Sequence, residues 1–253
     1  MKSGKFWFAL SVLLVIGFGC AQTHSQMKKK QTADAYYKLG IYYVENGNYK
    51  QAISEFRRAL DMNPGDPNYH FSMGTAYSLD GRDEAAIEEL KTALRLDPKY
   101  SEAHNNLGYI YAKKQRWAEA IAEFKAALAN PDYGRPYSAH LNLAQCYLEQ
   151  GNLETSIEEY RQALNSKPDS EIAHSGLARV YFRKGELDLA VEEYEKALKI
   201  NDRQISLYYE LAVVRLSRGD KEKAAKDFQT IIDLDPKSPL AEDARKQLEA
   251  MRK

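Results

Sequence analysis

The sequence predicts an all-α protein built as a solenoid of six helical hairpins followed by a capping helix. Three observations predict this fold. A dipeptide of a large apolar residue and Gly or Ala recurs at spacings of 34, 34, 36, 34 and 34 residues. Glycine follows the first half of most repeats, where a helix ends most easily in the left-handed conformation. Proline follows the second half of most repeats, where it cannot continue a helix.

Composition excludes several classes of protein. The chain has 253 residues, and its 36 Lys and Arg are balanced by 36 Asp and Glu. A neutral chain has no general electrostatic attraction for nucleic acid, so no nucleic-acid partner is expected. A hydrophobic content of 44% is too high for a disordered chain, and two cysteines are too few for a disulfide scaffold.

The N-terminus has the layout of a signal peptide. Lys2 and Lys5 precede an uncharged apolar run, residues 6–19, that ends at Cys20. As a helix this run would span about 21 Å, which is short of the roughly 30 Å hydrocarbon core of a bilayer. Residues 17–20 resemble the lipobox of bacterial lipoproteins, although Gly17 stands where that family favours Leu. The resemblance implies acylation of Cys20; plain secretion and an uncleaved anchor are the alternatives.

The segment after the cysteine is predicted to connect a membrane to the folded part. Residues 1–19 form the signal peptide, and residues 20–32 form the acylated N-terminus and a polar, flexible tether that contains Lys28-Lys29-Lys30. Ala21 resembles the sorting signal of outer-membrane lipoproteins. This resemblance implies a lipid-anchored protein of the bacterial outer membrane that faces the periplasm.

The period divides the rest of the chain into hairpins and a cap. Small residues recur at repeat positions 8, 20 and 27 and large ones at positions 7, 11 and 24, so that neighbouring helices can pack closely. Asp66-Pro67 and Ser238-Pro239 are typical of helix starts, and residues 239–253 form the capping helix. The six repeats are residues 33–66, 67–100, 101–136, 137–170, 171–204 and 205–238.

These positions match the signature of the tetratricopeptide repeat (TPR). The resemblance implies a right-handed superhelix whose concave face, lined by positions 5, 9 and 12 among others, receives a segment of a protein partner. Apolar side chains at these positions would form an exposed stripe. The alternative is that they pack between neighbouring first helices. The predicted groove residues are Tyr37, Ile41, Val44, Phe71, Tyr109, Leu141, Leu148, Phe182, Tyr209 and Val213.

Two local features depart from the repeat pattern. Gln115 replaces the turn glycine of the third repeat and predicts a less tight turn there. The same repeat is two residues longer, and residues 129–137 contain two prolines and a glycine, which predict a loop. This loop is either a tolerated insertion at a repeat junction or a protruding contact element with exposed Tyr133 and Arg135.

Recurring polar residues have a structural interpretation. Stacked repeats place equivalent residues about 10 Å apart, whereas metal ligands lie about 2 Å from a shared ion. We therefore expect no metal site from the histidines at position 4, which are His70, His104, His140 and His174. Glutamate pairs recur at positions 22 and 23 and predict a solvated helix face. Cys146 occupies an otherwise apolar position and is predicted to be buried.

The sequence contains none of the motifs that indicate catalysis. A phosphate-binding loop, a GxSxG nucleophile elbow, an HExxH zinc motif and a CxxC pair are all absent from the 253 residues. We therefore expect a protein that is not an enzyme and has no cofactor and no small-molecule substrate.

The whole mature chain resembles the PilW/PilF/Tgl family of type IV pilus biogenesis lipoproteins. The similar stretches are residues 35–40, residues 105–108 and the expanded linker with Pro131, Tyr133 and Arg135. The resemblance implies a pilotin, a non-enzymatic adaptor of the outer membrane that assists assembly or localisation of the secretin. Its partner would be a secretin subunit or a pilus assembly factor. The alternative is a TPR scaffold lipoprotein of another envelope system, such as polysaccharide export or protein sorting.

Overall fold

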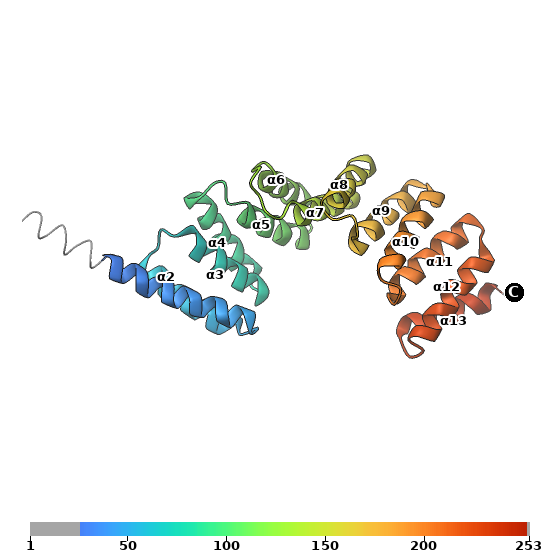
Figure 1. Ribbon diagram of the computed structural model, residues 1–253, viewed down its shortest axis with the longest axis horizontal. Coiled ribbons are helices and arrows are strands. Elements are labelled where there is room, and N and C mark those ends of the chain that lie inside the picture. Colours follow the sequence, from blue (N-terminus) through green and yellow to red (C-terminus); the bar gives the residue numbers. More distant parts are fainter. Residues whose placement is uncertain (1–25, 252–253) are drawn as a thin grey trace, which may run out of the picture. The chain divides into compact units, whose positions relative to one another are not determined.

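The computed structural model describes residues 26–251, and helices connected by short turns make up almost all of this part of the chain (Figure 1). No strand occurs within it. An N-terminal helix covers residues 26–45. The helices that follow are α2 (Tyr49–Met62), α3 (Pro67–Leu79), α4 (Asp83–Leu96), α5 (Ser101–Lys113), α6 (Trp117–Leu128), α7 (Pro136–Glu149), α8 (Leu153–Ser166), α9 (Glu171–Lys184), α10 (Leu187–Ile200), α11 (Ile205–Arg218), α12 (Lys221–Leu234) and α13 (Pro239–Met251).

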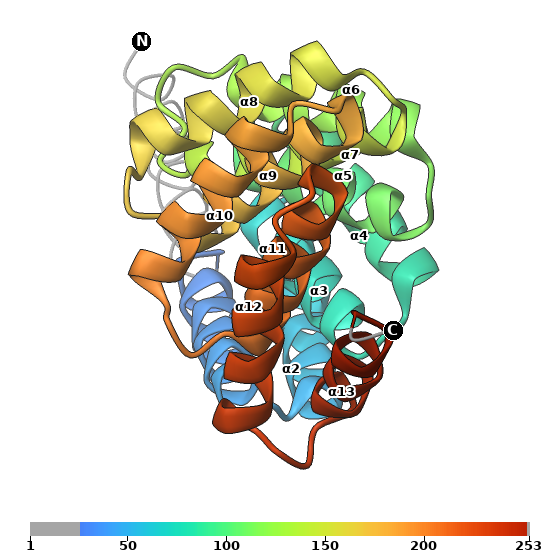
Figure 2. The ribbon, with the colours of Figure 1, turned by 90° about the vertical axis from the view of Figure 1, so that its right-hand side faces the viewer.

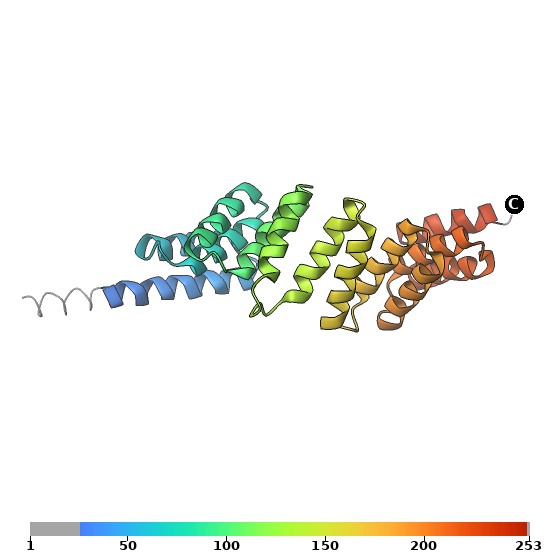
Figure 3. The same cartoon turned by 90° about the horizontal axis from the view of Figure 1, so that it is seen from above.

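The chain forms two compact units. Unit one ends at Ile110 and unit two begins at Tyr111, so the boundary falls inside α5. In each unit the principal contacts of a helix are with its neighbours along the chain, and Figures 2 and 3 show the two helices of α3–α4 and of α9–α10 side by side. This nearest-neighbour packing is typical of a repeat stack. The prediction of an all-α stack of helical hairpins is confirmed.

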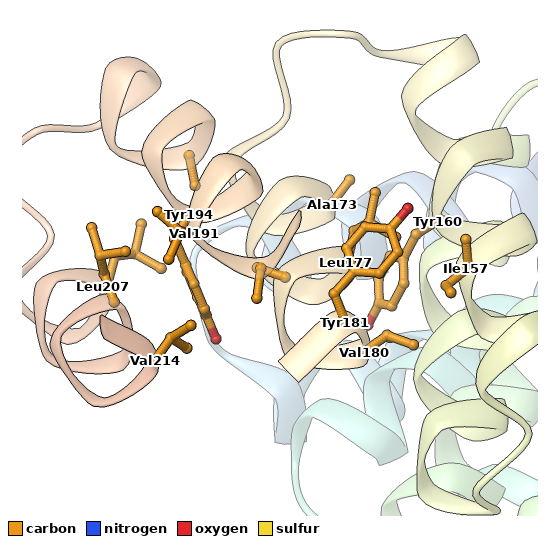
Figure 4. Close-up of a cluster of buried hydrophobic side chains, with 14 of the residues drawn as sticks. Ile157, Tyr160, Ala173, Leu177, Val180, Tyr181, Val191, Tyr194, Leu207 and Val214 are labelled. Carbon is orange, nitrogen blue, oxygen red and sulfur yellow. The ribbon is translucent and has the colours of Figure 1, made fainter. Parts of the chain in front are cut away.

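Small residues let the helices approach closely. The alanines at positions 20 and 27 have no exposed surface wherever they occur in the described repeats. A Cβ atom on Gly40 would lie 2.4 Å from the ring of Phe56, and one on Gly176 would lie 2.4 Å from the ring of Tyr160. Figure 4 shows the outcome in unit two, where Tyr160 and Tyr194 lie among aliphatic side chains from successive helices. Close packing of this kind provides the core.

The predicted helix starts are confirmed. Asp66 caps α3, because its Oδ1 accepts a hydrogen bond from the backbone N–H of Asn68 at 3.0 Å. Ser238 caps α13, because its Oγ accepts a hydrogen bond from the backbone N–H of Ala241 at 3.2 Å. Each side chain satisfies an N–H that the first turn of a helix leaves without a partner.

The tether prediction is wrong over residues 26–32. These residues are helical and continuous with the first helix of the first repeat. The segment contains no Gly or Pro, and its Lys and Gln residues favour a helix. Thr32 Oγ1 also donates a hydrogen bond to the carbonyl oxygen of Lys28 at 2.9 Å. The signal peptide, Cys20 and the rest of the predicted tether lie outside the described residues.

No helix in residues 26–251 is both long enough and apolar enough to span a bilayer.

The turn at Gln115 is as tight as the glycine turns, contrary to prediction. Gln115 has φ of 57°, inside the left-handed region occupied by the turn glycines at φ of 72° to 94°. The following N–H, of Arg116, donates to the carbonyl oxygen of Tyr111 at 2.9 Å, and the equivalent bond from Asn152 to Tyr147 is also 2.9 Å. The packing of the two helices therefore imposes this conformation on a residue that does not prefer it.

Histidines at position 4 pair with glutamates at position 23. Nδ1 of His70 lies 2.7 Å from Oε2 of Glu89, and the same pair recurs in the fourth and fifth repeats at 2.7 Å and 2.6 Å. Nε2 of His70 lies 3.0 Å from the carbonyl oxygen of Pro64 in the preceding repeat. His70, His140 and His174 thus join the two helices of their hairpins. His70, His104 and His174 also reach the preceding repeat.

The prediction of a solvated face is therefore wrong for position 23. The carboxylates at position 22, such as Glu88, are exposed, whereas Glu55, Glu193 and Asp227 at position 23 are buried. Their burial requires a partner, because an unpaired buried carboxylate is costly.

A second set of contacts joins consecutive repeats. The position-25 side chain of one repeat contacts the position-11 side chain of the next. Arg161 donates to the hydroxyl oxygen of Tyr181 at 3.1 Å, and Arg57 donates to that of Tyr77 at 3.4 Å. At the junction of the fifth and sixth repeats the basic residue lies at position 11 instead of position 25. Here Arg215 at position 11 donates to Glu195 at position 25 at 2.6 Å.

We expect Gln115→Gly to stabilise the protein by about 0.5–1 kcal/mol. Glycine removes the cost of the left-handed conformation, about 1–2 kcal/mol, although it adds freedom to the unfolded chain. Urea unfolding followed by circular dichroism measures the change. The matched control is Gly151→Gln at the equivalent turn, which should destabilise by a similar amount. A destabilised Gln115→Gly protein would contradict the strain assigned to this turn.

We expect Glu89→Ala to lower the free energy of unfolding by about 1–2 kcal/mol, because it removes the hydrogen-bond partner of His70 Nδ1. Its neighbour provides the control: Glu88→Ala changes an exposed residue of the same helix and should alter stability by less than about 0.5 kcal/mol. Equal effects of the two substitutions in urea unfolding would show that the His70–Glu89 pair does not stabilise the hairpin.

Candidate partner-binding surface

Aromatic side chains line the first helices of unit one. Tyr109 on α5 is 54% exposed. Tyr37 on the N-terminal helix stacks on Tyr69, with ring centroids 4.9 Å apart. Phe71 on α3 contacts Tyr100, with ring centroids 4.8 Å apart. Tyr37, Phe71 and Tyr109 are called the aromatic surface below. Two of its rings are held by neighbouring rings, and the third projects into solvent.

Two further predicted groove residues lie on the same helix as Tyr37. Ile41 and Val44 are both half-buried. Ile41 follows Tyr37 by four residues and Val44 follows Ile41 by three, and these spacings place all three on one side of the helix. Unit one holds the five groove residues predicted for its repeats, which are Tyr37, Ile41, Val44, Phe71 and Tyr109.

Polar groups beside the aromatic surface are mostly paired with one another. Asn106 Nδ2 donates to Thr75 Oγ1 at 3.1 Å, and Ser72 Oγ donates to the hydroxyl oxygen of Tyr37 at 3.2 Å. The exception is Oδ1 of Asn105, which is buried without a hydrogen-bond partner. Asn105 precedes Tyr109 by four residues and shares its helix face. A buried acceptor without a partner costs about 1–3 kcal/mol.

In unit two the predicted groove residues are largely part of the core. The prediction for Leu148 is wrong, because this side chain is only 3% exposed and packs in the core of α7 to α11. Leu141 and Phe182 are half-buried against the same core. Tyr209 packs edge-on against Phe228, with centroids 5.7 Å apart. These residues are packed in the core, but not solely between neighbouring first helices as the alternative interpretation expects, since Phe228 lies on α12, a second helix.

Val213 is half-buried on α11. It completes the set of predicted groove residues of unit two.

A polar network occupies the first helices of unit two. Tyr160 OH donates to Gln145 Oε1 at 3.1 Å, and Tyr194 OH donates to Glu210 Oε2 at 2.7 Å. Arg179 lies 3.7 Å from the same carboxylate of Glu210. Burial raises the pKa of Tyr160 to about 12 and also raises the pKa of Tyr194, so both hydroxyls stay protonated and act as donors. This surface is polar where unit one has aromatic rings.

The expanded linker does not expose its tyrosine. Tyr133 is 7% exposed and packs against Ala127 and Ala139, so the alternative of a protruding contact element is wrong for this residue. The tyrosine packs between residues near the end of α6 and residues near the start of α7. Arg135 is exposed, as predicted.

Cys146 is 1% exposed, which confirms the prediction of burial. The pKa of the thiol is raised to about 12, and the largest cause is desolvation of the buried side chain. The thiolate is the nucleophilic form, so this cysteine is chemically inert near neutral pH. Within residues 26–251 no group of three His, Cys, Asp or Glu side chains is arranged to hold a metal ion.

Solved structures with the same fold include two pilus proteins. The chain is similar to the structure of Pseudomonas aeruginosa PilF, with 20% identity and a TM-score of 0.75 over 87% of this chain and 99% of that one. It is also similar to PilW, described as a widely conserved type IV pilus biogenesis factor, with 24% identity and a TM-score of 0.77 over 88% and 99%. YrrB, a TPR protein with an unusual peptide-binding site, has 21% identity and a TM-score of 0.62 over 76% and 97%. A comparison with curated protein sequences gave no match.

Family models identify the repeats directly. One tetratricopeptide repeat model matches residues 37–101 and 81–135. A TPR repeat model matches residues 144–185 and 178–219, and a further tetratricopeptide repeat model matches residues 206–238. Together these matches cover more than half of the chain and include repeats in both units. The chain therefore belongs to the tetratricopeptide repeat family.

Proposed function

We propose that this protein is a non-enzymatic adaptor, held in the outer membrane by a lipid on Cys20, that acts as a pilotin in type IV pilus biogenesis. It binds a secretin subunit or a pilus assembly factor and assists assembly or localisation of the secretin. Two lines of support meet in this chain. Its leader ends at a lipobox-like cysteine, and its repeats match nearly the full lengths of the PilF and PilW structures.

The observation that carries the binding function is the aromatic surface of unit one. Exposed aromatic rings are common at protein interfaces, because they bury a large apolar area at a small cost in side-chain entropy. Tyr109 is more than half exposed, and it occupies position 9, one of the positions that line the binding face in the TPR family. In unit two, Gln145 and Arg179 occupy position 9, the position of Tyr109, and Arg179 lies 3.7 Å from Glu210. The apolar part of a partner therefore docks on unit one.

The stacked rings make the surface ready for binding. Tyr37 is held by Tyr69 and Phe56, and Phe71 is held by Tyr100. Because these side chains are already ordered, binding loses less conformational entropy than it would at a mobile surface. Acylation would also keep this surface at the membrane, since two or more acyl chains hold a protein stably at a bilayer. The protein thus presents a preformed surface at a fixed place.

We expect Tyr109→Glu to weaken binding of the purified secretin subunit from the same organism by at least about tenfold. The substitution places a charge where the partner's apolar surface is buried, which is costly without a counter-ion. Biolayer interferometry measures the dissociation constant. Leu189→Glu on α10 is the control, since Leu189 is a 41% exposed apolar residue of unit two. Unchanged affinity with Tyr109→Glu, or an equal loss with both variants, would place the site elsewhere.

We expect Cys20→Ser to move the protein from the membrane fraction to the soluble periplasmic fraction, because the acylated side chain is lost. Density-gradient fractionation with immunoblotting measures the distribution. Cells with this variant should also contain fewer heat-resistant secretin multimers in the outer membrane. Ala21→Ser is the control for a change beside the cysteine and should leave the distribution as in wild type. If the Cys20→Ser protein stays in the outer membrane, the lipid anchor is disproved.

A further inference from the structure

One end of the repeat stack exposes side chains that are buried in every other repeat. Leu39 and Tyr42 occupy positions 7 and 10 of the first repeat, and they are 39% and 57% exposed. Their counterparts in the other repeats are at most 6% exposed, since a preceding hairpin is available to cover them. These counterparts are Met73, Leu107, Leu143, Leu177 and Leu211 at position 7, and Ala76, Ile110, Cys146, Val180 and Val214 at position 10.

The exposed residues belong to a continuous face of the N-terminal helix. Residues 27, 31, 35, 38 and 42 follow one another at spacings of three and four, which place them along one side of a helix. Lys28 and Leu39 flank this line. We call the set the outer face. All of its members are exposed: Met27, Lys28, Gln31, Ala35, Lys38, Leu39 and Tyr42.

The outer face combines apolar and basic side chains. Met27, Leu39 and Tyr42 provide apolar area, and Lys28 and Lys38 provide positive charge. Glu45 is an acid at the end of the helix that is farther from Cys20. Asp34, by contrast, is turned toward unit one, where its Oδ1 accepts a hydrogen bond from Tyr69 OH at 2.5 Å. A tyrosine among apolar residues and lysines is typical of helices that lie at a membrane surface.

The covalent chain places this helix close to the proposed lipid. Five residues separate Cys20 from Gln26, where the described helix begins. Even fully extended, the six residue-to-residue steps from Cys20 to Gln26 span only about 20 Å. An acyl chain on Cys20 would therefore hold the start of the N-terminal helix within about 20 Å of the bilayer surface. Lys29 and Lys30, both exposed, lie in the first described turns of the same helix.

We propose that the outer face of the N-terminal helix lies on the anionic lipid surface of the membrane that carries the protein. The lysines lie at the headgroup phosphates, with their aliphatic parts along the apolar region, and Met27, Leu39 and Tyr42 enter the interface. The proposal rests on the proposed function only for the acyl anchor, which raises the local concentration of the helix at the bilayer.

The charge of the outer face favours lipid over a second copy of the chain. Two copies packed in parallel through this face would bring Lys28 and Lys38 of one chain near those of the other, and like charges repel. An anionic bilayer instead offers counter-charge to every lysine at once. The membrane would thus cover the end of the first repeat that no hairpin precedes.

The test uses the chain from residue 20 to 253 with Cys20→Ser, which carries no lipid. Co-sedimentation is measured with vesicles of phosphatidylcholine alone and with vesicles that contain about 30% phosphatidylglycerol. We expect binding several times stronger to the anionic vesicles, with most of it lost at about 0.5 M salt. Binding at millimolar lipid should still be weak enough that the same variant leaves the membrane in cells, because one weak signal does not anchor a protein stably.

Two variants and a control identify the face. Tyr42→Glu and the pair Lys28→Gln with Lys38→Gln should each lower the vesicle partition coefficient by about tenfold, with circular dichroism unchanged. Tyr109→Glu, on the aromatic surface, should leave vesicle binding unchanged. Equal binding to both kinds of vesicle, or no effect of the face variants, would overturn the proposal. So would a dimer seen by analytical ultracentrifugation that Tyr42→Glu dissociates, because a second copy would then cover the face.

The two proposals fail in different ways. If Cys20→Ser protein remains in the outer membrane of cells while vesicle binding behaves as described, the lipid anchor is wrong and the outer face is supported. If Cys20→Ser releases the protein but the anionic vesicles do not bind it, the anchor stands and the outer face is wrong.

Discussion

The architecture depends on how closely each helix approaches its neighbours. Alanine and glycine at fixed repeat positions allow backbones to come near enough that an additional Cβ on Gly40 would lie inside van der Waals contact of Phe56. Large residues one helix away then fill the remaining space. Because every contact of this kind is made with an adjacent helix, each repeat depends on the one before it and the one after it. The polar pairs follow the same rule. The His–Glu pairs join the helices of a hairpin, and the position-25 to position-11 pairs join consecutive hairpins.

Sequence-based prediction succeeds where structure is local or periodic. The caps at Asp66 and Ser238 were predictable, since a cap depends on residues within one turn of the helix. The burial of Cys146 follows from the apolar residues at the equivalent positions of other repeats. Gln115 was not predictable in this way, because its left-handed backbone results from the packing of two helices against each other. Tyr133 is buried for a similar reason, since its pocket exists only after α6 and α7 are in place.

The missed polar pairs left a signal in the sequence that a repeat alignment could have detected. His at position 4 occurs together with Glu at position 23 in the second to fifth repeats, whereas the first repeat has Tyr36 with Glu55 and the last has Tyr208 with Asp227. At the last junction, Arg215 replaces the tyrosine of other repeats while Glu195 replaces a basic residue. Changes at two positions in the same repeats indicate contact between them. Single positions considered separately predicted an exposed acidic face.

Repeat position alone could not predict how the candidate groove residues are covered. Repeat position alone predicts that a residue belongs to the first helix, but its exposure depends on what the neighbouring helix supplies. In unit one the neighbours of Tyr37 and Phe71 are other rings, so the surface remains aromatic. In unit two the hydroxyls of Tyr160 and Tyr194 donate hydrogen bonds to Gln145 and Glu210 of the first helices. Position 9 thus carries an exposed tyrosine in the third repeat and the polar residues Gln145 and Arg179 in the fourth and fifth repeats.

The first and last repeats differ in what covers their outer helices within the described residues. In unit two, Ala241 and Ala244 of α13 are fully buried against the last repeat, and the lysines and acids of this helix face solvent. In unit one, no such helix precedes the first repeat in the described chain, and Leu39 and Tyr42 remain exposed. An open end of this kind favours unwanted association unless something covers it. A lipid anchor a few residues away would bring the bilayer surface to this end, so that no additional helix is needed to cover it. The lysines beside Leu39 and Tyr42 are more favourable at an anionic bilayer than in a protein core. The end that lacks a cap helix would then be the end that meets the membrane, and this arrangement leaves the aromatic side chains of the first helices available to a protein partner.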